Sequence, residues 1–172
     1  MKNVTAVLIT TKDEYPKEIP IEGFGEVLIR TKSPSVFERY LLAEKAQNDI
    51  IYFQDDDCIV DYKALWRYYD GRLTNTMTPH HQAAYLSTGA TLVGWGCFFP
   101  KAMLKEFHRY IDRYGQDFHL FREADRIFTV LNQPHNTIIA PHQDLPQVGR
   151  MSHEPLHYEW AREAIAKTRA LL

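Results

Sequence analysis

The stretch Ile50-Ile51-Tyr52-Phe53-Gln54-Asp55-Asp56-Asp57 decides the fold of this chain. Its apolar run of strand-forming residues predicts a buried strand of an α/β sheet, and the run ends in three carboxylates. Those acids would lie at the carboxyl end of the strand, where open α/β sheets bind their ligands. Because adjacent carboxylates repel one another, a hard divalent cation would stabilise them. The stretch therefore predicts a metal–diphosphate site; the alternative is a solvated acidic turn without a ligand.

Composition describes an ordinary globular protein. The 172 residues suit one domain, with 45% hydrophobic and 24% charged residues. The net charge of -2 gives no global signature of nucleic-acid binding. Cys58 and Cys97 form neither a disulfide framework nor a metal-ligand set, which favours a reducing compartment. With no apolar span or signal region in the sequence, we expect a cytoplasmic protein without a membrane span.

Hydrophobic periodicity predicts alternating strands and helices around this stretch. Ser33 and Pro34 resemble a helix start, and Gly115 resembles a helix end. Such alternation predicts an α/β fold, with a mostly parallel, Rossmann-like central sheet flanked by helices in a single domain over 1–172. The expected strands cover 4–10, 25–31, 50–54 and 137–140, and the expected helices cover 33–49, 62–69, 100–115, a part of 118–131, and the chain from 159.

Two segments between these elements contain candidate binding residues. The stretch 74–81 has no regular period, which is typical of a mobile binding loop, and it includes His80 and His81, which are more simply explained as exposed side chains. Gly94 and Gly96 flank Trp95 and allow either close approach by a ligand or a bulged strand.

Further along the chain, the other candidate residues are Glu123, Asp125 and His157. Asp125 begins an apolar helical run, which places it near a helix N-terminus. Taken together, the motifs resemble those of GT-A glycosyltransferases, in particular the exostosin-like branch and small family-2-type enzymes. The resemblance extends from about Val4 to Arg162. The segments that carry it are Ala43-Glu44-Lys45-Ala46, the Asp-x-Asp motif at Asp55 and Asp57, Gly94 to Phe99, Glu123-Ala124-Asp125, and His157-Tyr158-Glu159 followed by Arg162.

The resemblance implies a minimal GT-A domain that transfers a sugar from a nucleotide-sugar donor, most simply a UDP-sugar, with Mn²⁺ or Mg²⁺ as cofactor. A cation on Asp57 would bridge the two phosphates of the leaving diphosphate. Asp55 would share the metal or bind the ribose, and His153, or its rival His157, would complete the ligand set. The other expected donor-binding residues are Thr10, Lys12, Asp56 and Arg150.

The expected catalytic residues are Asp125, Glu123 and Arg162. If the enzyme inverts, Asp125 is the general base; if it retains, Asp125 orients the acceptor or stabilises positive charge on the sugar. Gly94, Trp95 and Gly96 would line the acceptor pocket. The acceptor hydroxyl is left open, since a glycan, a lipid-linked glycan, a protein or a modified nucleobase would each fit.

Two other functions stay open at this point. A sugar nucleotidyltransferase has a similar sheet, but it usually has a glycine-rich loop after the first strand, and Thr10-Thr11-Lys12-Asp13 contains no glycine. A non-catalytic nucleotide- or glycan-binding module would bind nucleoside diphosphate without turnover.

Overall fold

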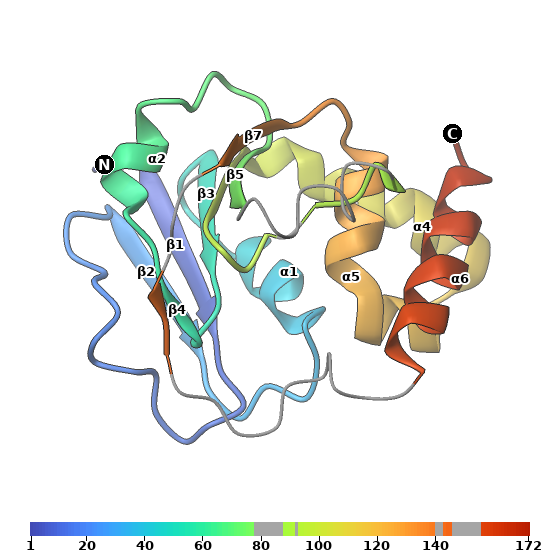
Figure 1. Ribbon diagram of the computed structural model, residues 1–172, viewed down its shortest axis with the longest axis horizontal. Coiled ribbons are helices and arrows are strands. Elements are labelled where there is room, and N and C mark those ends of the chain that lie inside the picture. The colour runs from blue at the N-terminus through green and yellow to red at the C-terminus, as the bar shows by residue number, and fades with distance from the viewer. Residues whose placement is uncertain (78–87, 92, 140–142, 146–155) are drawn as a thin grey trace.

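The computed structural model describes residues 1–77, 88–91, 93–139, 143–145 and 156–172. Figure 1 shows a sheet on one side of helix α1 and the helices α4, α5 and α6 on the other. The elements are β1 (Val4–Ile9), β2 (Glu26–Arg30), α1 (Glu38–Ala43), β3 (Ile50–Gln54), β4 (Cys58–Ile59), α2 (Tyr62–Trp66), β5 (Thr74–Met77), β6 (Cys97–Pro100), η1 (Lys101–Lys105), α4 (Glu106–Tyr114), α5 (Phe118–Leu131), β7 (Asn136–Ile139), β8 (Gln143–Asp144) and α6 (His157–Arg169).

The main sheet has six strands in the order β2-β1-β3-β6-β5-β7. Strand β1 pairs in parallel with β2 and β3, and β5 pairs in parallel with β7. Strand β6 is antiparallel to both of its neighbours, β3 and β5. Among the described strands of this sheet, β6 is thus the one that opposes the common direction. The expected α/β architecture, with a central sheet flanked by helices, is confirmed, and the sheet is mixed.

Strand β3 explains the two-layered core. Because alternate side chains of a strand face opposite sides of the sheet, Ile51 and Phe53 pack against α1, α4 and α5, whereas Tyr52 packs towards α2. The first of these cores contains the rings of Tyr40 and Phe128, with centroids 5.1 Å apart. Burial on both faces explains why the sequence of this strand is a continuous apolar run.

Two expectations about local structure are wrong. The helix after β2 starts at Glu38 rather than near Ser33, because the Ser33 hydroxyl donates to the Ser35 carbonyl and its N–H donates to the Thr10 carbonyl. That helix also ends at Ala43, earlier than expected. The first part of the expected loop at 74–81 is strand β5, within the sheet between β6 and β7.

Strand β5 is buried although three of its four residues are polar. Asn75 explains this, because its side chain donates to the Thr91 hydroxyl at 2.6 Å and accepts from the Thr137 hydroxyl at 3.0 Å. Buried polar groups are tolerated when they are hydrogen-bonded in this way. Both His80 and His81 lie outside the described residues.

The helical half agrees more closely with the sequence. Gly115 ends α4 with a φ of 71°, as expected for a helix C-terminus. Helix α5 covers Phe118–Leu131, and α6 begins at His157, two residues before the expected start. No helix in the described parts of the chain has both the length and the apolar character needed to cross a membrane.

The aromatic core is expected to contribute much of the free energy of unfolding. Phe128 is fully buried, and its ring centroid lies 4.9 Å from that of Phe99 and 5.5 Å from that of Phe107. We expect Phe128→Ala to lower the free energy of unfolding by about 3–5 kcal/mol, since it leaves a cavity between the sheet and the helices. Urea unfolding measures this loss. The matched control is Tyr158→Ala, at a ring that is 74% exposed, and an equal loss in both variants would contradict the assignment of the core.

Candidate functional site

The acidic turn after β3 is held in place through its backbone. The Asp55 N–H donates to the Gly94 carbonyl at 2.7 Å, and the Tyr15 hydroxyl donates to the Asp55 carbonyl at 3.1 Å. Directly before the turn, buried Gln54 donates to the Cys58 carbonyl at 2.8 Å. These contacts hold the backbone on both sides of the three acids.

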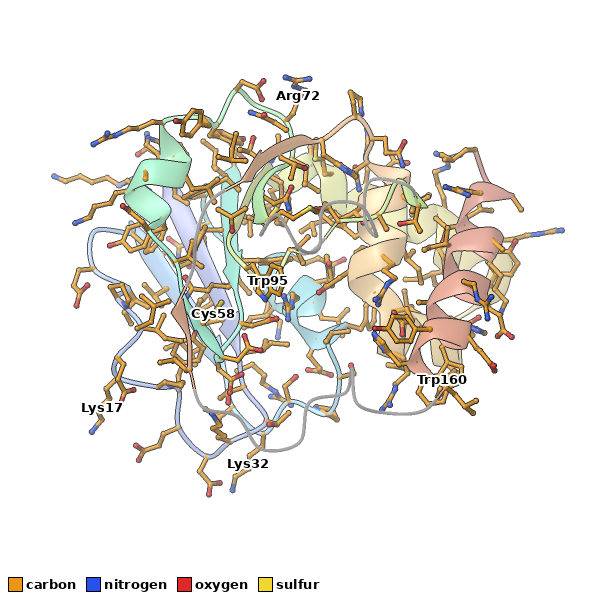
Figure 2. The ribbon with its side chains drawn as sticks, viewed as in Figure 1. Lys17, Lys32, Cys58, Arg72, Trp95 and Trp160 are labelled. Atoms are coloured by element: carbon orange, nitrogen blue, oxygen red, sulfur yellow. The ribbon has the colours of Figure 1, made fainter. Side chains whose placement is uncertain are left out.

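Gly94 makes room for one of those carboxylates. A Cβ atom added at Gly94 would lie 1.8 Å from Asp55 Oδ2. The close approach to Gly94 that the sequence suggested for a ligand is made here by the Asp55 carboxylate. Gly96 has a φ of +88°, and Trp95 between them is half-buried, with its carbonyl accepting from the Thr76 hydroxyl. In Figure 2, Trp95 is seen over the middle of the molecule, whereas Trp160 lies on α6 at the edge.

The acids of the triplet have different surroundings. Asp56 accepts from the buried Thr10 hydroxyl, and its Oδ2 lies 3.5 Å from Lys12 Nζ. Asp55 forms an ion pair with Arg39 and keeps 32% of its side chain exposed. The carbonyl of Asp57 accepts from the Leu145 N–H at 2.7 Å, next to the short β4–β8 pair. A positively charged side chain thus faces each of these two acids: Arg39 faces Asp55, and Lys12 faces Asp56.

Arg39 connects the acidic turn to α5. Its side chain is only 2% exposed, and its Nη1 lies 3.6 Å from Asp125 Oδ2. Tyr40, the next residue of α1, donates its hydroxyl to Asp125 Oδ1 at 2.7 Å. Asp55 and Asp125 are 70 positions apart in the sequence, yet one guanidinium contacts both.

Sequence reasoning did not identify Arg39 as part of the site. A signal was available, because Arg39 follows Val36 by three positions and precedes Ala43 by four, which places it on the same helix face as these two apolar residues. A charge at such a position is rarely buried unless it is paired.

Burial dominates the electrostatics of Asp125. Removal from water raises the pKa of this carboxyl above its ordinary value, and the nearby Asp55 raises the pKa further. The Arg39 charge and the Tyr40 hydrogen bond oppose the rise without cancelling it. Burial also raises the pKa of the Tyr40 hydroxyl, so it remains a donor. Asp125 therefore combines a partly accessible carboxyl, 19% exposed, with a raised affinity for a proton.

Glu123 has a structural setting distinct from that of Asp125. Its φ of -124° and ψ of 24° interrupt α5, and its side chain is 1% exposed. Glu123 pairs with Arg126, and its Oε1 lies 3.4 Å from Nδ1 of His157. Arg126 Nη2 lies 3.2 Å from Nε2 of the same ring. This cluster joins the start of α6 to the break in α5.

The structure also bears on the expected places of Asp125 and His157. Helix α5 starts at Phe118, so Asp125 is not near the N-terminus of the whole helix; it lies two residues after the break at Glu123. His157, the rival metal ligand, has both ring nitrogens next to protein groups, Glu123 and Arg126. In this arrangement the ring ties α6 to α5 through both of its nitrogens.

The structure brings some of the expected site residues together and leaves others apart. Arg162 is exposed on α6, and no contact found within the described residues joins it to Asp125. Arg150 and His153 lie outside the described residues. The residues that do converge at the acidic turn are Thr10, Lys12, Asp55, Asp56, Asp57, Asp125 and the turn from Gly94 to Gly96.

A metal at this turn would need ligands beyond the side chains that the structure describes. Among the residues that the structure describes, no three His, Cys, Asp or Glu side chains form a metal-holding group. Carboxylate oxygen is nevertheless the ligand that Mg²⁺ prefers, and Mg²⁺ is usually held by one or two carboxylates together with substrate phosphates. Two acids of the turn, Asp55 and Asp56, face Arg39 and Lys12, and the carboxylates of the turn fit that second arrangement, with Asp57 as the expected ligand.

Comparison of the chain with protein-family models and with curated proteins finds no match. The similarity to GT-A glycosyltransferases stays a prediction from the motifs.

Gly94 gives a direct test of the geometry. We expect Gly94→Ala to lower the free energy of unfolding by about 1–3 kcal/mol, because the new methyl group displaces the Asp55 carboxylate. The loss is steric, since Gly94 has no positive φ. Urea unfolding would measure this loss. Gly71→Ala is the comparison for backbone strain without a clash, because Gly71 has a φ of +88° and a Cβ added there meets nothing within 4 Å. Wild-type stability in Gly94→Ala would show that Asp55 does not occupy this space.

Proposed function

We propose that this protein is a metal-dependent glycosyltransferase of the GT-A type, which moves a sugar from a nucleotide sugar, most simply a UDP-sugar, to an acceptor hydroxyl. The observation that carries the proposal is the contact of Arg39 with both Asp55 and Asp125. It unites the acidic turn at the carboxyl end of β3 and a half-buried acid of raised pKa in one site. Group transfer requires the donor and the reacting group to be held next to each other, and one side chain contacts both acids here.

The acidic turn is the proposed donor end. Asp57 would hold Mg²⁺ or Mn²⁺ together with the diphosphate oxygens, and the cation would stabilise the charge that builds on the leaving diphosphate. Lys12, whose Nζ lies 3.5 Å from Asp56, is close enough to the turn to contact a phosphate oxygen. Asp55, fixed by Arg39 but still 32% exposed, is suited to accept a hydrogen bond from a ribose hydroxyl.

Asp125 is the proposed acid at the reacting centre. Its raised pKa brings the carboxyl closer to the range in which a general base is effective. With inversion, Asp125 would take the proton of the acceptor hydroxyl; with retention, it would orient the acceptor or stabilise positive charge on the sugar. The half-buried Trp95, next to the Gly94 that contacts Asp55, is the proposed wall of the acceptor pocket.

The metal is tested by ligand-dependent stability. We expect UDP with Mn²⁺ at about 100 times its Kd to raise the Tm of the wild type by roughly 5–10 °C. Asp57→Ala should abolish the Mn²⁺-dependent part of this shift, because it removes the proposed metal ligand. Thermal shift with UDP, with and without Mn²⁺, measures the effect.

The matched control is Asp112→Ala, which removes an exposed acid on α4. An unchanged Mn²⁺-dependent shift in Asp57→Ala would exclude the metal assignment. A normal shift in the wild type without release of diphosphate from any donor would instead indicate a nucleotide-binding module.

Asp125 is tested by sugar transfer. We expect Asp125→Asn to lower the transfer rate by about 10²–10⁴-fold, because the amide cannot accept a proton. The Tm and the UDP affinity should stay close to wild type, since Asn retains the oxygen that accepts from Tyr40 and the charge it removes is already disfavoured by burial. Transfer at the wild-type rate, or loss of cooperative unfolding, would place the reacting centre elsewhere.

A further inference from the structure

The Arg39 guanidinium is more deeply buried than either acid that it contacts. Its side chain is 2% exposed, against 32% for Asp55 and 19% for Asp125. Burying an ionised side chain costs free energy unless it is paired and hydrogen-bonded. Within the described residues, Nε and Nη1 of Arg39 have no hydrogen-bond acceptor. The pairing of this charge is therefore incomplete on the side that faces Asp125.

The two contacts of Arg39 differ in closeness. Nη2 is hydrogen-bonded to Asp55 Oδ1, whereas Nη1 lies 3.6 Å from Asp125 Oδ2. A hydrogen bond between such groups needs about 2.7–3.2 Å, so a movement of less than 1 Å would close the second contact. Tyr40 restrains Asp125 from the same helix through its hydroxyl at 2.7 Å.

We infer that Arg39 is a positioning residue that couples the acidic turn to Asp125, so that occupation of the donor end at Asp55 sets the position of the acid at the reacting centre. The inference deepens the proposed function and rests on it for the roles of the two acids. A ligand hydroxyl at Asp55 would compete with Nη2, and the guanidinium would then shift towards Asp125. Donor binding would thereby bring Nη1 within hydrogen-bond distance of Asp125 Oδ2.

The chemistry favours arginine for this role. The planar guanidinium presents donors in a fixed fork and can bind two acids at once, whereas a lysine ammonium is a single point charge. The aromatic surroundings hold the fork in place, since Arg39 Cζ lies 5.6 Å from the centroid of the Phe53 ring. A lysine at position 39 would keep the charge and lose the simultaneous contact.

The coupling is tested without any donor by a double-mutant cycle. Asp55→Asn and Asp125→Asn each leave Arg39 with one acid, and the double variant leaves it with none. We expect the Tm loss of the double variant to exceed the sum of the two single losses by at least about 2 °C. The excess should disappear when the cycle is repeated on Arg39→Lys. It should persist on Tyr40→Phe, the matched control, because Tyr40 contacts Asp125 but makes no described contact with Asp55. Additive losses in the wild type would overturn the coupling.

Sugar transfer then tests the positioning role. We expect Arg39→Lys to lower kcat by at least about tenfold with the donor KM within about twofold of wild type, because the charge stays while the geometry at Asp125 is lost. Cooperative unfolding of Arg39→Lys is the folding control. A reduced Tm with an unchanged kcat would show that Arg39 only fills the core, which overturns the inference.

The two proposals fail in different ways. If the wild type releases no diphosphate from any nucleotide sugar, the proposed function fails, while the donor-free cycle still decides whether Arg39 couples the two acids. If transfer occurs and the cycle is additive, the proposed function stands and the role of Arg39 is wrong.

Discussion

The pairing of one buried positive charge constrains much of this structure. Arg39 lies between the sheet and α5, where its charge requires carboxylates nearby. One comes from the end of β3 and the other from the middle of α5, so the relative position of strand and helix is tied to the pairing. Phe53, whose ring lies beside the guanidinium, and Tyr40, the next residue of α1, belong to the aromatic core that joins the same elements. The polar site and the apolar core are therefore built on the same residues.

The antiparallel strand β6 supplies the other half of the site. Because β6 runs against β3, the turn that precedes β6 lies beside the end of β3. Gly94 in that turn accepts from the Asp55 N–H and leaves space for the Asp55 side chain. A sheet with β6 in the common direction would place this turn at the opposite edge. The single reversal of direction among the described strands of the sheet thus brings the glycine turn to the acids.

The parts of this fold that could be predicted from the sequence are those governed by apolar periodicity. Strands β1, β2 and β3 and helices α5 and α6 follow it, and the acidic triplet could be placed at a strand end for the same reason. Strand β5 could not, because its burial depends on Asn75 finding Thr91 and Thr137 across the chain. Arg39 was missed for a similar reason: a helical pattern shows which face is buried, but not that a distant acid will compensate a charge on it.

The space reserved at Gly94 has an evolutionary consequence. A side chain at position 94 requires a smaller residue at position 55, and a smaller residue there removes the closer of the two acids from Arg39. The cost of a substitution at 94 thus depends on the residues at 55 and 39, which lie on different elements. Such dependence is epistasis, and it predicts that these three positions change together or not at all in descendants that keep this site.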